Sequence, residues 1–72
     1  MFLRLDRAEK SVEQFIKSAK DDEKLKSRGY QEWGDITVLR GHLNKAREMY
    51  EKAKKLGDPN GIAKASLAEL PE

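Results

Sequence analysis

The stretch YQEWGDITVLRGHLNKAREMYEKA, residues 30–53, decides the fold of this chain. Ala46, Tyr50 and Ala53 follow one another at steps of four and three residues, so their side chains share one helix face. Small residues on such a face let a second helix approach closely, and large aromatic side chains fill the volume beside the contact. The pattern predicts two antiparallel helices in tight contact. The predicted packing residues are Tyr30, Trp33, Gly34, Ala46, Tyr50 and Ala53.

Glycine and polar residues around this stretch predict where the two helices begin and end. The first helix opens at Ser27 or Arg28 and ends at Gly41, while Asn44 caps the second and Gly57 ends it. A glycine inside a helix, as at position 34, costs about 1 kcal/mol relative to alanine, and close approach by a neighbouring backbone is the physical reason to tolerate it. The helix pair is therefore predicted over 27–57.

A further helix is predicted on each side of the pair. Asp6 and Glu9 have the spacing of an N-cap pair, which predicts an N-terminal packing helix over 6–26, with fraying or a turn at 21–24 left open. The order Asp58-Pro59 favours a new helix start, so a C-terminal capping helix is predicted over 59–70, ended by Pro71. The apolar stripes of these two helices are Val12, Phe15, Ile16 and Ala19, and Ala63, Ser66, Leu67 and Leu70.

The composition is that of one small helical domain covering residues 1–72. Seventy-two residues, 38% hydrophobic and 39% charged, are near the size at which one core only marginally offsets chain entropy. A net charge of +2 is too small to indicate nucleic-acid binding by itself. The absence of cysteine excludes disulfides and thiolate metal sites. Since the opening MFLRLD is too short an apolar run for a signal peptide or membrane span, the cytoplasm is the default expectation.

Residues 27–60, with the aromatic and small residues above and the ending LGDPN, resemble one degenerate tetratricopeptide repeat, a family with a period of about 34 residues. The segment GIAKASL, 61–67, resembles the start of a following repeat. Two departures are Thr37, where the family usually has a large aromatic, and Leu43, where tyrosine is common. The resemblance implies an all-α, right-handed stack of antiparallel helical hairpins, about four helices in all. Whether the chain is a whole protein or part of a longer array stays open.

The same resemblance implies a protein–protein interaction module, an adaptor or scaffold, with a ligand groove on the first helix of the repeat. The residues it implies for partner binding are Arg28, Gln31, Asp35, Val38 and Leu39. The version of the family that grips a C-terminal carboxylate uses lysine, arginine and asparagine, which Gln31, Glu32 and Asp35 do not match. An ordinary solvated face is the alternative, because a single repeat gives a groove little depth.

Two other function classes remain open. One is a small assembly or regulatory subunit that self-associates through uncovered apolar residues such as Phe2, Leu3 and Leu5, if these do not fold back over the core. The other is a nucleic-acid or anionic-surface binder that uses the basic third helix, although Glu48 and Glu51 favour a plain solvated surface there. The basic residues of that helix are Lys45, Arg47, Lys52, Lys54 and Lys55.

Catalysis, cofactors and metals are not expected. His42 is the single histidine and lies in a predicted turn, with no cysteine or carboxylate pair that the predicted faces bring beside it. The ligand count for a metal site fails for the same reason. Aromatic residues at helical spacing are usually core, so Trp33 and Tyr50 are not read as a stacking platform. The glycines of 57–61 follow no strand, so this segment is a turn and not a phosphate loop.

Overall fold

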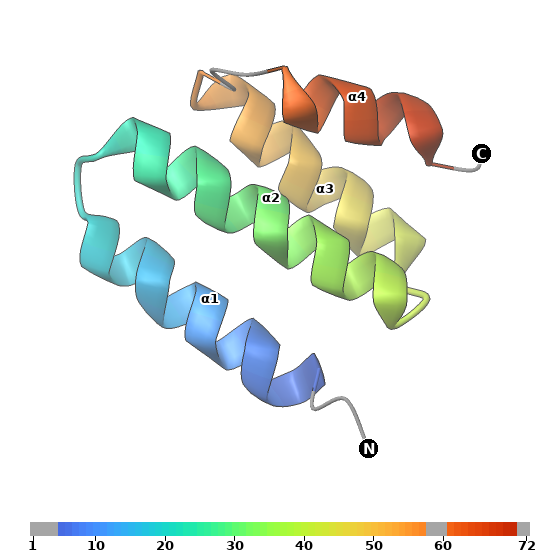
Figure 1. Ribbon diagram of the computed structural model, residues 1–72, viewed down its shortest axis with the longest axis horizontal. Helices are drawn as coiled ribbons and strands as arrows, with labels where there is room; N and C mark the ends of the chain where they lie inside the picture. The colour runs from blue at the N-terminus through green and yellow to red at the C-terminus, as the bar shows by residue number, and fades with distance from the viewer. Residues whose placement is uncertain (1–4, 58–60, 71–72) are drawn as a thin grey trace.

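In the computed structural model, which describes residues 5–57 and 61–70, those residues form four helices and no strand. The helices are α1 (Leu5–Ala19), α2 (Glu23–Leu39), α3 (Leu43–Lys55) and α4 (Ile62–Glu69). Each helix packs on the next, and the largest contact joins α2 to α3 (Figure 1). The predicted all-α fold, built from helical hairpins, is confirmed.

The crossing of α2 and α3 is as close as the small residues predict. Ala46 and Ala53 have no exposed surface, and Tyr50 is 3% exposed. A β-carbon added at Gly34 would overlap the ring of Tyr50, so only glycine fits there without a shift of the ring. The buried Ser27 hydroxyl donates a hydrogen bond to the Ala53 carbonyl oxygen at 2.7 Å. Packing therefore holds the two helices together with a polar link between them.

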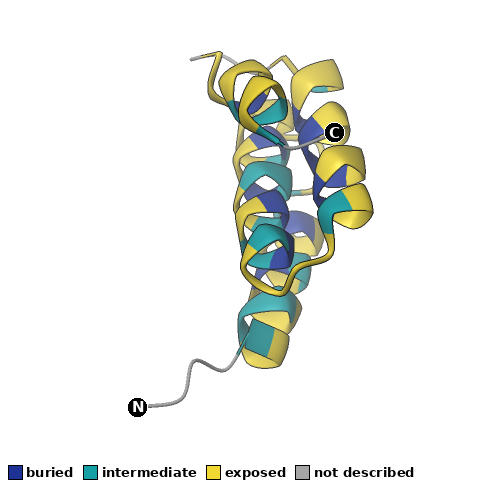
Figure 2. Ribbon diagram, turned by 90° about the vertical axis from the view of Figure 1, so that its right-hand side faces the viewer, coloured by how far each residue is buried: buried dark blue, intermediate teal, exposed yellow. Residues whose placement is uncertain are grey.

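A second close crossing, between α1 and α2, is centred on Gly29, which is not among the predicted packing residues. A β-carbon at Gly29 would lie 2.6 Å from Cγ1 of Ile16, and Val12 and Ile16 are each 8% exposed. Phe15, expected on the same buried stripe, is instead 38% exposed at the edge of this contact. In Figure 2 the buried positions lie where the helices face one another.

Tyr30 and Trp33 differ from the expectation that they fill the α2–α3 contact, because both are half-buried. Their rings are stacked and almost parallel, with centroids 6.2 Å apart. Lys45 lies over the Trp33 ring at 5.5 Å and Lys52 over the Tyr30 ring at 5.6 Å. Thr37, on the same helix, has no exposed surface, and its side chain is short enough to be fully enclosed. Lysine side chains from α3 thus lie over both aromatic rings.

Several helix boundaries differ from the predicted ones. The predicted 6–26 helix is divided, because α2 begins at Glu23 and not at Ser27 or Arg28. The side chain of Asp22 accepts a hydrogen bond from the Leu25 backbone N–H at 3.1 Å, which makes Asp22 the N-cap. His42, and not Asn44, is the N-cap of α3.

The ends of the described chain show further differences. Because α1 begins at Leu5, Asp6 lies in its first turn, and Glu9 turns toward α2 instead of capping α1. Gly61, with φ of +66°, is the N-cap of α4, so this helix begins at Ile62 rather than at 59. The predictions for Phe2, Leu3, Asp58, Pro59 and Pro71 lie outside the described residues. Among the described helices, none combines the length and apolar character needed to cross a bilayer.

Candidate functional site

The structure brings together three of the five residues predicted to bind a partner. Asp35, Val38 and Leu39 line a groove on α2. Arg28 is exposed on the N-terminal half of the helix, where its side chain lies 3.7 Å from Glu32. Gln31 is half-buried and, like Arg28, is not part of the groove lining.

The groove lies between α2 and α4, with α3 beneath it, and has a volume of about 400 Å³. Its lining residues are Asp35, Val38 and Leu39 from α2, Tyr50 from α3, and Ser66, Glu69 and Leu70 at the end of α4. The α4 side was not predicted, because the resemblance implies a groove on a single helix. The signal was the spacing of Ser66, Glu69 and Leu70, which puts these residues on one helix face.

Tyr50 forms the floor of the groove and fixes one of its polar groups. Its hydroxyl donates a short hydrogen bond to Oδ1 of Asp35. Burial, together with this bond and the charge of Asp35, raises the pKa of Tyr50 well above its ordinary value of 10.0, while a hydrogen bond with Ser66 acts in the opposite direction. The phenol therefore stays protonated at neutral pH and holds the Asp35 carboxylate at the groove.

The walls of the groove are apolar and its charged groups are acidic. Leu39 is 66% exposed, more than Phe15, Leu25 or Ile62, and Val38 and Leu70 are half-buried beside it. Asp35 and Glu69 are the charged residues of the lining, and no lysine or arginine accompanies them among the described residues of the groove. The groove thus offers apolar contact and two carboxylates from different helices.

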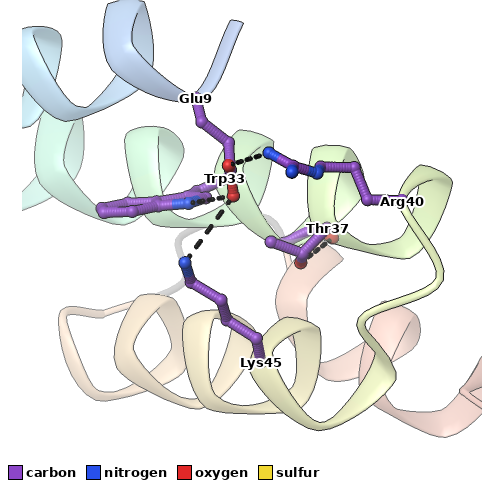
Figure 3. Close-up of polar contacts among 6 residues, drawn as sticks. Glu9, Trp33, Thr37, Arg40 and Lys45 are labelled. Carbon is purple, nitrogen blue, oxygen red and sulfur yellow. Dashed lines mark hydrogen bonds and ion pairs between the residues drawn. The ribbon is translucent and has the colours of Figure 1, made fainter. Parts of the chain in front are cut away.

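A second polar cluster is centred on Glu9 and joins three helices (Figure 3). One carboxylate oxygen of Glu9 accepts a hydrogen bond from the indole N–H of Trp33 at 3.0 Å, and the other lies 2.6 Å from the guanidinium of Arg40. Lys45 of α3 approaches the same carboxylate at 3.8 Å. Since the Glu9 side chain is only 15% exposed and its oxygens already have partners inside the chain, this cluster is structural.

The basic face of α3 is partly engaged in contacts within the chain. Lys45 faces Glu9 and Trp33, and Lys52 faces Glu48 at 3.9 Å as well as Tyr30. Contacts of this kind lower the number of cations that a phosphate backbone would meet on this face. Elsewhere, the described residues contain no group of three or more His, Asp or Glu side chains placed to hold a metal ion.

Comparisons of this chain with protein-family models, with curated proteins and with solved structures found no match. The function of this chain is therefore inferred from the geometry of the groove and from the chemistry of its residues.

Proposed function

We propose that this chain is a protein–protein interaction module, an adaptor or scaffold, that binds a peptide or helix of a partner in the groove between α2 and α4. The observation that carries the proposal is the exposed Leu39 beside a carboxylate already fixed by Tyr50. Burial of an exposed aliphatic side chain by a partner is favourable by about 25 cal/mol per Å² of apolar surface. A fixed polar group next to it gives orientation to that contact.

The resemblance to a tetratricopeptide repeat supports the same assignment. The helix pair α2 and α3 crosses at small residues, and α4 follows in the place where a next repeat would begin. A right-handed stack of the tetratricopeptide kind, located in the cytoplasm, is part of the proposal. With α4 as a second wall, a single repeat gains the groove depth that one helix face alone lacks.

Catalysis is not part of this proposal, because the Tyr50 hydroxyl and the Asp35 carboxylate are hydrogen-bonded to each other. Tyr50 is held protonated and points its hydrogen at Asp35, so it suits neither a base nor a nucleophile at neutral pH. Self-association through Leu39 is the alternative function of the same surface, and NMR distinguishes it from peptide binding.

The test is selection of displayed random peptides on the full chain, followed by NMR mapping of a selected peptide. Amide shifts confined to 35–39 and 66–70 are expected. The variant Leu39→Asp is expected to abolish binding, while Ile62→Asp is the matched control, since Ile62 is also an exposed aliphatic residue and lies outside the groove. Shifts on the basic face of α3, an equal effect of both variants, or no selected peptide would refute the proposal. Concentration-dependent shifts of 35–39 without peptide would assign the surface to a second copy.

A further inference from the structure

The charge of the groove is opposite in sign to the charge of the whole chain. The chain carries a net charge of +2, whereas the residues that line the groove include two carboxylates and no cation among the described residues. Long-range electrostatics of the chain alone would favour an acidic partner. The local field at the groove favours a basic one, and at contact distance the local charges dominate because distant surface charges are screened.

The Asp35 carboxylate is held in position by a hydrogen bond within the chain. Its Oδ1 accepts the hydrogen bond from Tyr50, and Tyr50 is 3% exposed, so the carboxylate has a fixed position before any partner arrives. Within the described residues, neither Asp35 nor Glu69 forms an ion pair. A cation that enters the groove therefore meets carboxylates from two helices without displacing a lysine or arginine of this chain.

The apolar part of the groove adjoins these carboxylates. Val38 and Leu39 come from the same end of α2 as Asp35, and Leu70 follows Glu69 directly. A side chain that fits both parts combines aliphatic carbons with a terminal cation, which is the chemistry of lysine and arginine. A large apolar neighbour in the same segment would cover Leu39, which is 66% exposed.

We infer that the groove selects partner segments in which a lysine or arginine stands next to large apolar residues. This inference rests on the proposed function and gives the chemical class of the partner. Acidic segments and free C-terminal carboxylates are disfavoured, because they would bring like charges against Asp35 and Glu69.

The test uses three sets of short synthetic peptides with capped ends and the same apolar residues. The sets differ in whether the remaining positions carry Lys and Arg, Gln, or Asp and Glu. Binding to the full chain is measured by fluorescence anisotropy at low and moderate salt. The basic set is expected to bind about three to ten times more tightly than the Gln set, as two exposed ion pairs would produce, with the advantage reduced at moderate salt.

The decisive variant is Asp35→Asn with Glu69→Gln, because it removes both charges while the new amide oxygen at 35 keeps an acceptor for Tyr50. The control is Glu48→Gln with Glu51→Gln, which makes the same change in net charge on the exposed side of α3. Loss of the basic preference in the first double variant alone is expected. Circular dichroism shows whether each variant keeps its helices.

The other outcomes separate this inference from the proposed function. Equal binding of all three sets, abolished by Leu39→Asp, would overturn the basic preference and leave the groove as the binding site. Preference for the acidic set, or a basic preference that survives in the Asp35 and Glu69 variant, would also overturn it. If no set binds to the folded chain, the inference is refuted, and the display selection decides the proposed function.

Discussion

Gly34→Ala is expected to destabilise the chain although alanine is the better helix former. Alanine in the middle of α2 gains about 1 kcal/mol from helix propensity. Against this, the new methyl group would overlap the ring of Tyr50, which has almost no exposed surface into which it can move. Forcing an extra carbon into such a contact costs about 1–3 kcal/mol.

The displaced ring also carries the hydroxyl that bonds to Asp35. A hydrogen bond to a charged group contributes about 1.5–3 kcal/mol, and a tilt of the ring loses part of it. With the gain in propensity subtracted, Gly34→Ala should lower the free energy of unfolding by about 1–4 kcal/mol. In a domain of this size, each kcal/mol corresponds to about 4–8 °C in the melting temperature.

Urea unfolding followed by far-ultraviolet circular dichroism measures this change, and Ala65→Gly on the exposed side of α4 measures the propensity effect separately. The same Gly34→Ala change in a Tyr50→Leu background should cost less, because the smaller side chain leaves room for the methyl group. An unchanged or raised unfolding midpoint for Gly34→Ala in the wild-type background would refute the tight contact between Gly34 and the Tyr50 ring.

Four further changes test other parts of the structure. Ala53→Glu places a charge where no surface is exposed and should unfold the chain, at a cost of about 3–5 kcal/mol; unchanged melting would refute the placement of Ala53. Glu9→Gln should lower stability by about 0.5–2 kcal/mol in urea unfolding, and a double-mutant cycle with Arg40→Gln that shows no coupling would contradict the ion pair. Because burial and a carboxylate partner raise the pKa of Tyr50 above 10.0, the unfolded chain loses that proton first as pH rises past 10. The free energy of unfolding should then fall by up to about 1.4 kcal/mol per pH unit through this group, and Tyr50→Phe should fall less steeply; parallel slopes would argue against the raised pKa. Lys20→Gly should stabilise the chain by about 0.5–1 kcal/mol in thermal melting, because Lys20 has φ of +50°; a loss of stability would count against that turn.

The α2–α3 crossing could be predicted from the sequence because the residues that produce it follow one another at helical spacing within each helix. Small residues at helical spacing leave few arrangements other than a close helix pair, and Ala46, Tyr50 and Ala53 are buried as predicted. The glycines at 41 and 57 mark the ends of α2 and α3 for an equally local reason, their positive φ.

The role of Glu9 could not be predicted because its partners are distant in the sequence. Its spacing from Asp6 suits an N-cap pair, but the side chain contacts Trp33 and Arg40, 24 and 31 residues away. Whether Glu9 caps α1 or contacts distant residues depends on how α1 packs on α2. The residue pattern of α1 alone does not give that packing. The half-buried position of Trp33 has the same origin, since its indole N–H needs the acceptor that Glu9 supplies.

The candidate groove was predicted in part for a related reason. Helical spacing places Asp35, Val38 and Leu39 on one face, but only packing against α4 turns that face into a groove. Arg28 and Gln31 share the helical face but are not among the residues that line the groove with α4. Spacing thus predicts which residues lie together on a helix, and contact with a neighbouring helix decides which of them form a site.

The groove and the helix crossing are linked through one side chain. The absence of a side chain at Gly34 gives the Tyr50 ring its place, and the ring sets the direction of the hydroxyl that holds Asp35. A change at Gly34 that leaves the chain folded should therefore shift the Asp35 carboxylate and lower the affinity for basic peptides, although Gly34 does not line the groove. By contrast, a β-carbon at Gly29, at the α1–α2 crossing, would meet Ile16 and Phe15, neither of which lines the groove. A tolerated change at Gly29 should therefore alter stability without altering the preference for basic peptides.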